Sequence, residues 1–385
     1  MTAPLVAQQA VLPPIVLPPY GSSTLAELMP SIGAHLSVPG YTEDAFGLPP
    51  SDRYVVVMID GLGWHPMRSA VRDMPYLASL LGAAQPISAC VPSTTTTSLT
   101  SLGTGLPPGQ HGLVGYTSRV PSTGEILNAL TWESDLLPRA FQAKATFFER
   151  AAASGVAVTS VALERFQGSG LTEAALRGAA FVGFQHENDL DERVELVGAA
   201  AERARRTLVY AYERELDHCG HVDGCHSVAW RRQLRRIDRM CERLRAALPD
   251  DVRLVITGDH GMIDVPKNHQ IVAEDEPILM AGVSALAGEA RFRQLYVDRD
   301  QPARVAARWR DRLGATAWVR TRDEAIDEGW FGPVDELLRE RWGHVLVAMR
   351  DDHAVMTRQF MREWTLIGMH GSLTPAEMTV PLCCD

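Results

Sequence analysis

Runs of apolar residues that lead into an acidic residue or a histidine recur along this chain, and this feature most constrains its fold. Three such runs, each with the residues that follow it, are Tyr54–Ile59 before Asp60, Thr207–Tyr212 before Asp217, and Arg253–Thr257 before Asp259-His260. Runs that are apolar throughout are typical of parallel strands buried on both faces. Because the carboxyl ends of parallel strands meet at one edge of a sheet, we expect these polar side chains to converge there.

Helical segments alternate with the strands. The predicted helices are Ser22–Leu36, Met74–Leu81, Thr96–Gly103, Thr146–Ala153, Leu190–Arg206 and Val228–Ala247. Further strands are predicted at Gln85–Val91 and Ala157–Ala162. This alternation predicts an α/β fold in which helices cover both faces of a mostly parallel central sheet.

The chain of 385 residues is long enough for a large core with a smaller unit attached. Residues 1–50 are rich in proline and contain no Lys or Arg, so we expect them to wrap the surface. Residues 51–276 are predicted to form the first part of the core. Residues 277–356 are predicted to form a small inserted α+β module with the pattern β-α-β-α-β, and residues 357–385 to return to the core.

The overall charge limits the class of partner. A net charge of -10 argues against binding to a nucleic-acid polymer, which would require a basic face. It is compatible with a small anionic substrate, because bound metal ions can dominate the local field. No apolar run approaches the ~20 residues of a membrane span, and the first residues lack the basic start of a secretory signal. We therefore expect a cytoplasmic protein that does not bind membranes and has free thiols. The sequence leaves the oligomeric state open.

A set of side chains of the kind that bind metal ions is spread over the chain. Its members are Asp60, Thr95, Asp217, His221, Asp259, His260 and His370. Carboxylates, imidazoles and a hydroxyl in this number could hold two adjacent divalent metal ions and supply a metal-activated nucleophile. The combination indicates phosphoryl-transfer chemistry. Mixed nitrogen and oxygen ligands favour zinc, with Mn²⁺ as the alternative.

Five motifs in order along residues 54–379 resemble those of the alkaline phosphatase superfamily, most closely its nucleotide pyrophosphatase/phosphodiesterase branch. They are Asp60-Gly61, then Pro92 with Thr95, Thr104-Gly105 and His111-Gly112, then Asp217, Gly220, His221 and Gly224, then Asp259–Met262, and finally Gly368, His370 and Gly371. The resemblance implies an alkaline-phosphatase-like three-layer sandwich. It also implies a two-metal phosphodiesterase or nucleotide pyrophosphatase that acts on a small anionic phosphate ester such as a nucleotide.

The resemblance also implies roles for the side chains. One metal ion would be bound by Asp60, Thr95, Asp259 and His260, and the other by Asp217, His221 and His370. Thr95 would attack phosphorus at the start of a helix, where backbone N–H groups favour a phosphate. Water would then cleave the phospho-threonine intermediate, and two in-line displacements give net retention at phosphorus.

The sequence leaves several alternatives open. Ser93, Thr94, Thr95, Thr96 and Thr97 are consecutive, so Thr94 is the second candidate nucleophile. Ser98 stands where this branch usually has an Asn that holds a phosphate oxygen, and Ser98, Lys267 and His269 are the candidate substrate contacts. A phosphomonoesterase, a phosphonate hydrolase and a non-catalytic metal-binding scaffold are the alternative functions. A sulfatase is disfavoured, because Thr94 replaces the Arg that should follow Cys90-Val91-Pro92-Ser93.

Overall fold

The structure is a computed structural model that describes residues 15, 17–297 and 301–385. Residues 1–14 and 16 of the expected N-terminal segment lie outside this range. In the described part of the chain, no helix combines the length and apolar character needed to cross a membrane. The six cysteines are all free thiols.

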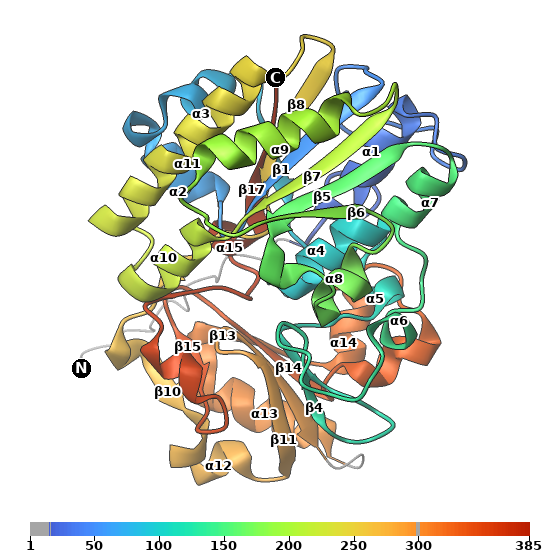
Figure 1. The fold of residues 1–385 in the computed structure, drawn as a ribbon. Coiled ribbons are helices and arrows are strands. Elements are labelled where there is room, and N and C mark those ends of the chain that lie inside the picture. The colour runs from blue at the N-terminus through green and yellow to red at the C-terminus, as the bar shows by residue number, and fades with distance from the viewer. Residues whose placement is uncertain (1–14, 16, 298–300) are drawn as a thin grey trace, which may run out of the picture.

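A seven-stranded sheet forms the centre of the larger half of the molecule, with strand order β2-β17-β8-β1-β7-β5-β6 (Figure 1). Its strands are β1 (Arg53–Ile59), β2 (Gln85–Ser88), β5 (Ala157–Leu163), β6 (Ala180–Phe184), β7 (Thr207–Glu213), β8 (Val252–Gly258) and β17 (Thr379–Cys384). β17 runs opposite to the strands on either side of it, β2 and β8. The predicted α/β class, with a mostly parallel sheet between two helical layers, is confirmed.

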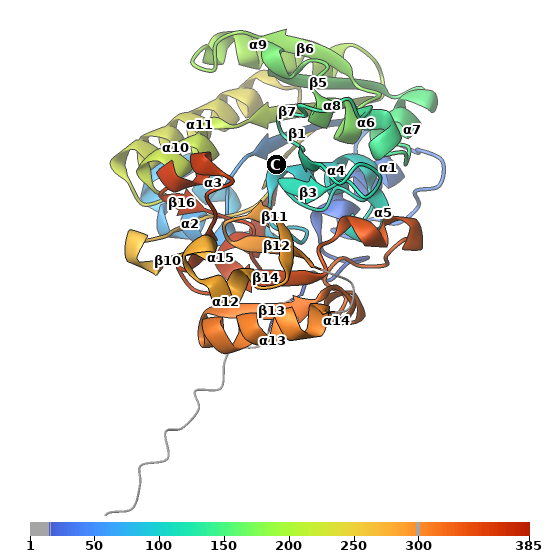
Figure 2. The ribbon, with the colours of Figure 1, turned by 90° about the horizontal axis from the view of Figure 1, so that it is seen from below.

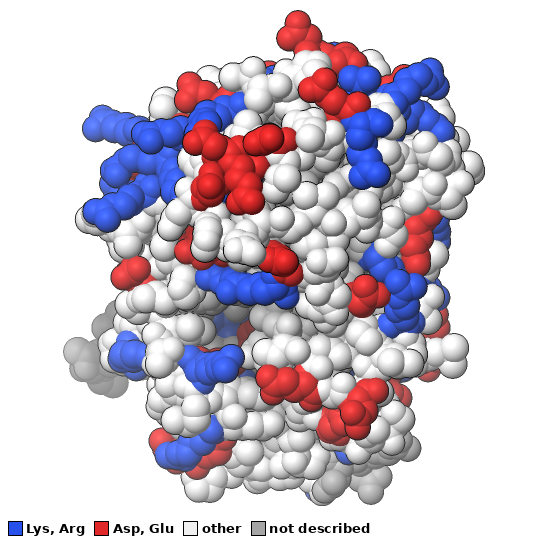
Figure 3. All heavy atoms as spheres, viewed as in Figure 1, with Lys and Arg blue, Asp and Glu red and all other residues white. Residues whose placement is uncertain are grey.

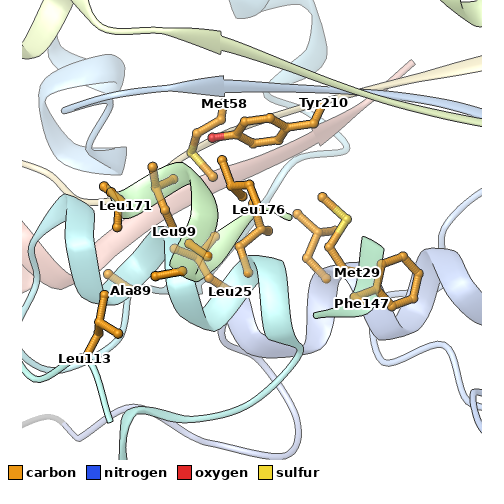
Figure 4. Packing of buried hydrophobic residues seen from close by; sticks show 14 of the residues in the cluster. Leu25, Met29, Met58, Ala89, Leu99, Leu113, Phe147, Leu171, Leu176 and Tyr210 are labelled. Atoms are coloured by element: carbon orange, nitrogen blue, oxygen red, sulfur yellow. The ribbon is translucent and has the colours of Figure 1, made fainter. Parts of the chain in front are cut away.

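The central position of β1 follows from its sequence, RYVVVMI. Alternate side chains point to opposite faces of a strand. Tyr54, Val56 and Met58 therefore enter one hydrophobic core, while Val55 and Val57 enter the other. Figure 4 shows Met58 and Tyr210 from the sheet packed against Leu99 and Leu176 from the helical layer. A strand that is buried on both faces needs apolar residues at every position, which explains the unbroken run.

Two helical layers cover the sheet. The helices of one layer are α2 (Trp64–Ser69), α3 (Pro75–Leu80), α9 (Leu190–Glu202) and α11 (Val228–Ala247). Those of the other are α1 (Leu28–His35), α4 (Thr95–Thr104), α7 (Phe147–Ala153) and α8 (Gly170–Ala175). The predicted bounds of α11 are those observed. Its start is fixed by Ser227, whose side chain accepts a hydrogen bond from the backbone N–H of Trp230.

The described part of the N-terminal segment is not confined to the surface. A 3-10 turn at Leu25–Glu27 leads into α1, and Leu25, Leu28, Met29 and Ile32 are fully buried in the core that also contains α4. The high proline content and the lack of Lys and Arg predicted a surface segment. The apolar residues of the helix are instead spaced so that one face packs into the core.

A second, four-stranded sheet forms the smaller half of the molecule, with order β11-β12-β14-β13 and antiparallel pairing throughout (Figure 2). Its strands are β11 (Val283–Glu289), β12 (Phe292–Val297), β13 (Ala317–Thr321) and β14 (Val345–Met349), and α13 (Pro302–Leu313) and α14 (Arg322–Asp327) accompany them. The β-α-β-α-β pattern expected within residues 277–356 corresponds to β12, α13, β13, α14 and β14. The structure has one further strand, β11, before them. A parallel pair, β10 (Gln270–Val272) with β15 (Ala354–Met356), spans the expected boundary near residue 276.

Short elements complete the described chain. The helices are α5 (Pro108–His111), α6 (Pro138–Phe141), α10 (Glu215–Asp223), α12 (Pro277–Met280) and α15 (Pro375–Met378). The strands are β3 (Thr117–Arg119), β4 (Ile126–Asn128), β9 (Ile263–Asp264) and β16 (Gly368–Met369), and β9 pairs with β16.

His111 of the nucleophile motif has a structural role. Its Nδ1 accepts the backbone N–H of Leu113, so the proton lies on Nε2, which is 2.9 Å from Ser101 Oγ on α4. The side chain is 1% exposed. Burial and the nearby Arg341 lower its pKa to about 3. This histidine is therefore neutral, and its contact with Ser101 holds α5 against α4.

A pH-dependent contribution to stability follows from this burial. A depressed folded-state pKa gives stability that is present above pH ~6.5 and is lost as the pH falls and the unfolded chain takes up the proton. We expect His111→Gln to lower the free energy of unfolding at pH 7.5, and this deficit to shrink by about 2 kcal/mol at pH 5. Guanidinium unfolding at both pH values measures it. The exposed His226→Gln serves as the control, and a deficit that does not change with pH would contradict the neutral state of His111.

Candidate metal centre and active site

Two groups of side chains could hold a metal ion and are called the metal-binding groups below; the first lies beyond the ends of β1 and β8. It contains Asp60, Asp259 and His260, all of them buried. His260 Nε2 is 3.3 Å from Asp60 Oδ1 and 3.6 Å from Asp259 Oδ2. Gly61 allows the close approach of α10, because a Cβ at this position would lie 3.0 Å from the Cα of Asp217 and its φ is +76°. Gly61, the glycine of the Asp-Gly motif, thus lets Asp217 lie close to the group that contains Asp60.

The second group contains Asp217, His221 and His370. Asp217 and His221 lie on α10, where a spacing of four residues puts both side chains on one face. His221 Nε2 is 3.4 Å from Asp217 Oδ2, and His370 Nε2 is 3.8 Å from Asp217 Oδ1. The His370 ring stacks on that of His260 with centroids 3.6 Å apart, so the two groups are adjacent.

The three imidazoles are oriented alike. Nδ1 of His221, His260 and His370 lies 2.8 to 3.0 Å from the carbonyl oxygens of Gly368, Gly261 and Ser93, respectively. A carbonyl oxygen only accepts, so each Nδ1 carries the proton. Nε2 of each ring is the nitrogen directed at the carboxylates, which is the orientation that histidine ligands adopt in metal sites.

The electrostatics of both groups fit bound cations. Asp217 Oδ1 and Asp259 Oδ2 are buried without a hydrogen-bond partner among the described residues. Burial and the charge of Asp60 raise the pKa of both carboxyls well above the usual range. Burial acts to lower the pKa of His260, but Asp259 and Asp60 raise it to about 10. A proton on Nε2 thus occupies the position that a cation would take.

The hydroxyls of the nucleophile stretch point in different directions. Thr95, the first residue of α4, has its Oγ1 3.3 Å from His260 Nε2 and 3.5 Å from Asp60 Oδ1. Thr94 precedes the helix and also lines the cavity described below. Ser93 Oγ donates to the carbonyl of Ser372, and Thr97 Oγ1 to that of Leu113. Among the described hydroxyls of the stretch, only that of Thr95 lies within 3.5 Å of a metal-binding side chain.

A cavity of about 460 Å³ opens over both groups. Figure 3 shows this face of the molecule hollowed between its two halves, with Lys or Arg side chains beside the hollow. Most of the wall is aromatic or aliphatic, and these residues include Tyr116, Leu130, Phe166, Leu171, Leu176, Phe181 and Tyr212. The charged residues of the wall, besides the metal-binding groups, are Arg214, Glu289, Arg362 and Glu363.

Comparison with known proteins identifies the family. Residues 54–373 match the model of type I phosphodiesterases/nucleotide pyrophosphatases. The chain belongs to this family. No curated protein matches it in sequence.

Solved structures with a similar fold come from two kinds of hydrolase. Murine ectonucleotide pyrophosphatase/phosphodiesterase 5 has 15% identity and a TM-score of 0.68, with 86% of this chain and 87% of that chain covered. An inactive form of it in complex with AMP gives a TM-score of 0.67 at the same identity and coverage. Phosphonoacetate hydrolase from Sinorhizobium meliloti 1021, in complex with phosphonoformate, has 19% identity and a TM-score of 0.68, with 88% and 91% covered. These likenesses show a shared fold, while the assignment to a phosphodiesterase/pyrophosphatase family rests on the family match.

Three predicted substrate contacts of this phosphodiesterase-family protein do not lie in the cavity. Ser98 is fully buried in the first turn of α4 and does not line the cavity. Lys267 Nζ donates to the carbonyl of Trp364, and His269 Nδ1 lies 2.8 Å from Asp352. None of the three lines the cavity, and their contact with substrate stays a prediction.

The sequence interpretation missed Tyr212, Glu289 and Arg362. Tyr212 lies on β7, and its hydroxyl donates to Asp60 Oδ2. Glu289 ends β11, and Arg362 lies in the segment that follows β15. Alternation along β7 could have placed Tyr212 on the face that contains Tyr210. No local sequence pattern predicts that Glu289 and Arg362 line the cavity.

The Tyr212 hydroxyl should tune metal binding. It orients Asp60, and loss of such an outer hydrogen bond typically weakens metal affinity ~10- to 100-fold. We expect this loss for Tyr212→Phe, measured by competition for zinc with a chromogenic chelator. Tyr210→Phe is the matched control, because the Tyr210 hydroxyl is buried without a hydrogen-bond partner in the described structure. Equal affinities for the two variants would contradict the role of the Tyr212 hydroxyl.

Proposed function

We propose that this chain is a two-metal phosphodiesterase that hydrolyses a small phosphate diester or pyrophosphate bond through a phospho-Thr95 intermediate. The observation that carries the proposal is the position of Thr95 Oγ1, which lies at the start of α4 within 3.5 Å of both Asp60 and His260 and faces the cavity. The expected ligand sets are Asp60, Thr95, Asp259 and His260 for one ion, and Asp217, His221 and His370 for the other.

Bound divalent ions, with zinc favoured by the mixed ligands, would neutralise the buried carboxylates and lower the pKa of the Thr95 hydroxyl and of a water molecule. The protein supplies the rest. Backbone N–H groups in the first turn of α4 have no carbonyl partner within the helix, so they can bind the oxygens of a phosphate beside Thr95. Attack by Oγ1 displaces the leaving group, and water attack on phospho-Thr95 then restores the hydroxyl.

The cavity wall favours a diester over a monoester. Aromatic and aliphatic side chains can accommodate the apolar part of a substrate group, which a diester carries on both sides of phosphorus. Glu289 lies beside the nucleophile stretch, where its Oε1 accepts the backbone N–H of Tyr116 and the Thr94 hydroxyl stabilises its charge. Its Oε2 is buried without a hydrogen-bond partner among the described residues. A carboxylate here repels the second negative charge of a monoester.

The nucleophile is tested by the pair Thr95→Ala and Thr94→Ala. We expect Thr95→Ala to lower the turnover of bis-p-nitrophenyl phosphate by at least ~10³-fold, because the covalent step is lost. Thr94→Ala should retain most of the turnover. Zinc content, measured in both variants, separates loss of the nucleophile from loss of metal. Near-normal turnover by Thr95→Ala, with the loss in Thr94→Ala, would transfer the role to Thr94.

The charge of Glu289 should set the preference for diesters. Burial raises its pKa to about 7, so it is charged at pH 8.5. We expect Glu289→Gln to raise kcat/KM for p-nitrophenyl phosphate relative to bis-p-nitrophenyl phosphate by about tenfold at pH 8.5, the effect of ~1.4 kcal/mol of repulsion. Glu289→Asp keeps the charge and should keep the wild-type ratio. A wild-type enzyme that prefers the monoester would instead indicate a phosphomonoesterase. A wild-type protein that hydrolyses neither ester would indicate a phosphonate hydrolase or a non-catalytic scaffold.

A further inference from the structure

A third group of metal-binding side chains lies outside the catalytic cavity. It consists of His269, Asp352 and His353, whose possible ligand atoms all lie within 4.8 Å of one another. None of the three lines the cavity over the catalytic groups. The group therefore needs an explanation of its own.

The pairing of β10 with β15 brings these residues together. The two strands are parallel, and Gln270 lies opposite Ala354. His269 and His353 immediately precede this pair of residues, so the register sets their side chains next to each other. The two imidazole rings stack with centroids 4.5 Å apart and an interplanar angle of 3°. Two histidines separated by more than eighty residues in sequence thus present the same edge in the same direction.

Both rings direct Nδ1 at one carboxylate oxygen. Asp352 Oδ1 is 2.8 Å from His269 Nδ1 and 3.6 Å from His353 Nδ1. Nδ1 of His353 is buried and has no hydrogen-bond partner among the described residues. Ligand atoms around a tetrahedral zinc ion lie about 3.4 Å apart, given metal–ligand bonds of about 2.1 Å. The two observed separations bracket this value.

The donor set also fits a divalent metal ion. Two imidazole nitrogens and one carboxylate oxygen are ligands that zinc and its neighbours in the first transition row accept. The side chains of His269, Asp352 and His353 are 34%, 44% and 24% exposed, so solvent can reach the group and complete the coordination. Partial exposure also lets the imidazole rings turn out of their stacked arrangement, which is required for both Nδ1 lone pairs to meet at one ion.

We propose that His269, Asp352 and His353 bind an additional divalent cation of the zinc class, separate from the catalytic ions. This ion joins the segment that leaves the Asp259–Met262 motif to the end of the predicted inserted module, because one ligand comes from the first segment and two from the second. Its effect is to hold the β10–β15 pair closed. An ion bound only by the folded protein raises its stability.

The test is a count of zinc bound to the full-length protein. Wild type and the double variant His269→Ala/His353→Ala are equilibrated with Zn²⁺, passed through a desalting column and analysed for zinc and protein. We expect the double variant to bind about one zinc ion fewer per chain than wild type. His226→Ala, which removes an exposed histidine outside the three groups, should bind as much as wild type. The difference between variants is measured, so the result is independent of how many ions the catalytic groups bind.

A second measurement covers the case in which the double variant does not fold. Asp352→Asn keeps a carbonyl oxygen beside His269 but removes the charge, so it should fold and bind the ion weakly. We expect added Zn²⁺ to raise the Tm of wild type by more than that of Asp352→Asn. Equal zinc content in wild type and the double variant, or equal Tm shifts in wild type and Asp352→Asn, would overturn the proposal and leave a hydrogen-bonded His-Asp-His cluster without a metal.

Discussion

Three buried carboxylates in one small volume are the constraint on which the rest of this structure depends. Burial and the charge of Asp60 raise the pKa of both Asp217 and Asp259, and one oxygen of each of these two carboxyls has no hydrogen-bond partner among the described residues. An unpaired buried carboxylate costs several kcal/mol, so the arrangement requires positive charge. The orientation of the three imidazoles, each held by a backbone carbonyl, supplies the remaining ligands without adding negative charge.

The two halves of the molecule contribute different groups to the site. The central sheet and the helices around it carry the metal-binding groups and the nucleophile stretch, on elements fixed by packing on both faces. The smaller half contributes Glu289 to the cavity wall, and the segment after β15 contributes Arg362. Groups that carry out the proposed chemistry are therefore rigidly placed. Glu289 and Arg362 of the cavity wall come from the smaller half and the segment after β15, whereas the apolar wall with Phe166, Leu171 and Tyr212 belongs to the larger half.

Sequence patterns predicted the elements with strong periodicity and missed those without it. β1 and α11 were predicted within a residue of their observed bounds, because one is buried on both faces and the other has a regular apolar stripe. β6 at the sheet edge is only five residues long and only partly buried, and Gly183 interrupts its β-favouring residues, so it was not predicted. α10 carries Asp217 and His221 but buries little beyond Leu216 and Gly220, and no helical pattern marks it.

The sequence by itself determined the fold class and marked the seven residues that we propose as metal ligands. Each lies in a short motif tied to a strand end, a helix start or a single helical turn, so local order specifies its position. Only the tertiary structure decided what surrounds them. It excluded Ser98, Lys267 and His269 from the cavity, brought Glu289 to the nucleophile stretch, and set His269 beside His353. These contacts join segments far apart in the chain through strand register and packing, which no local pattern encodes.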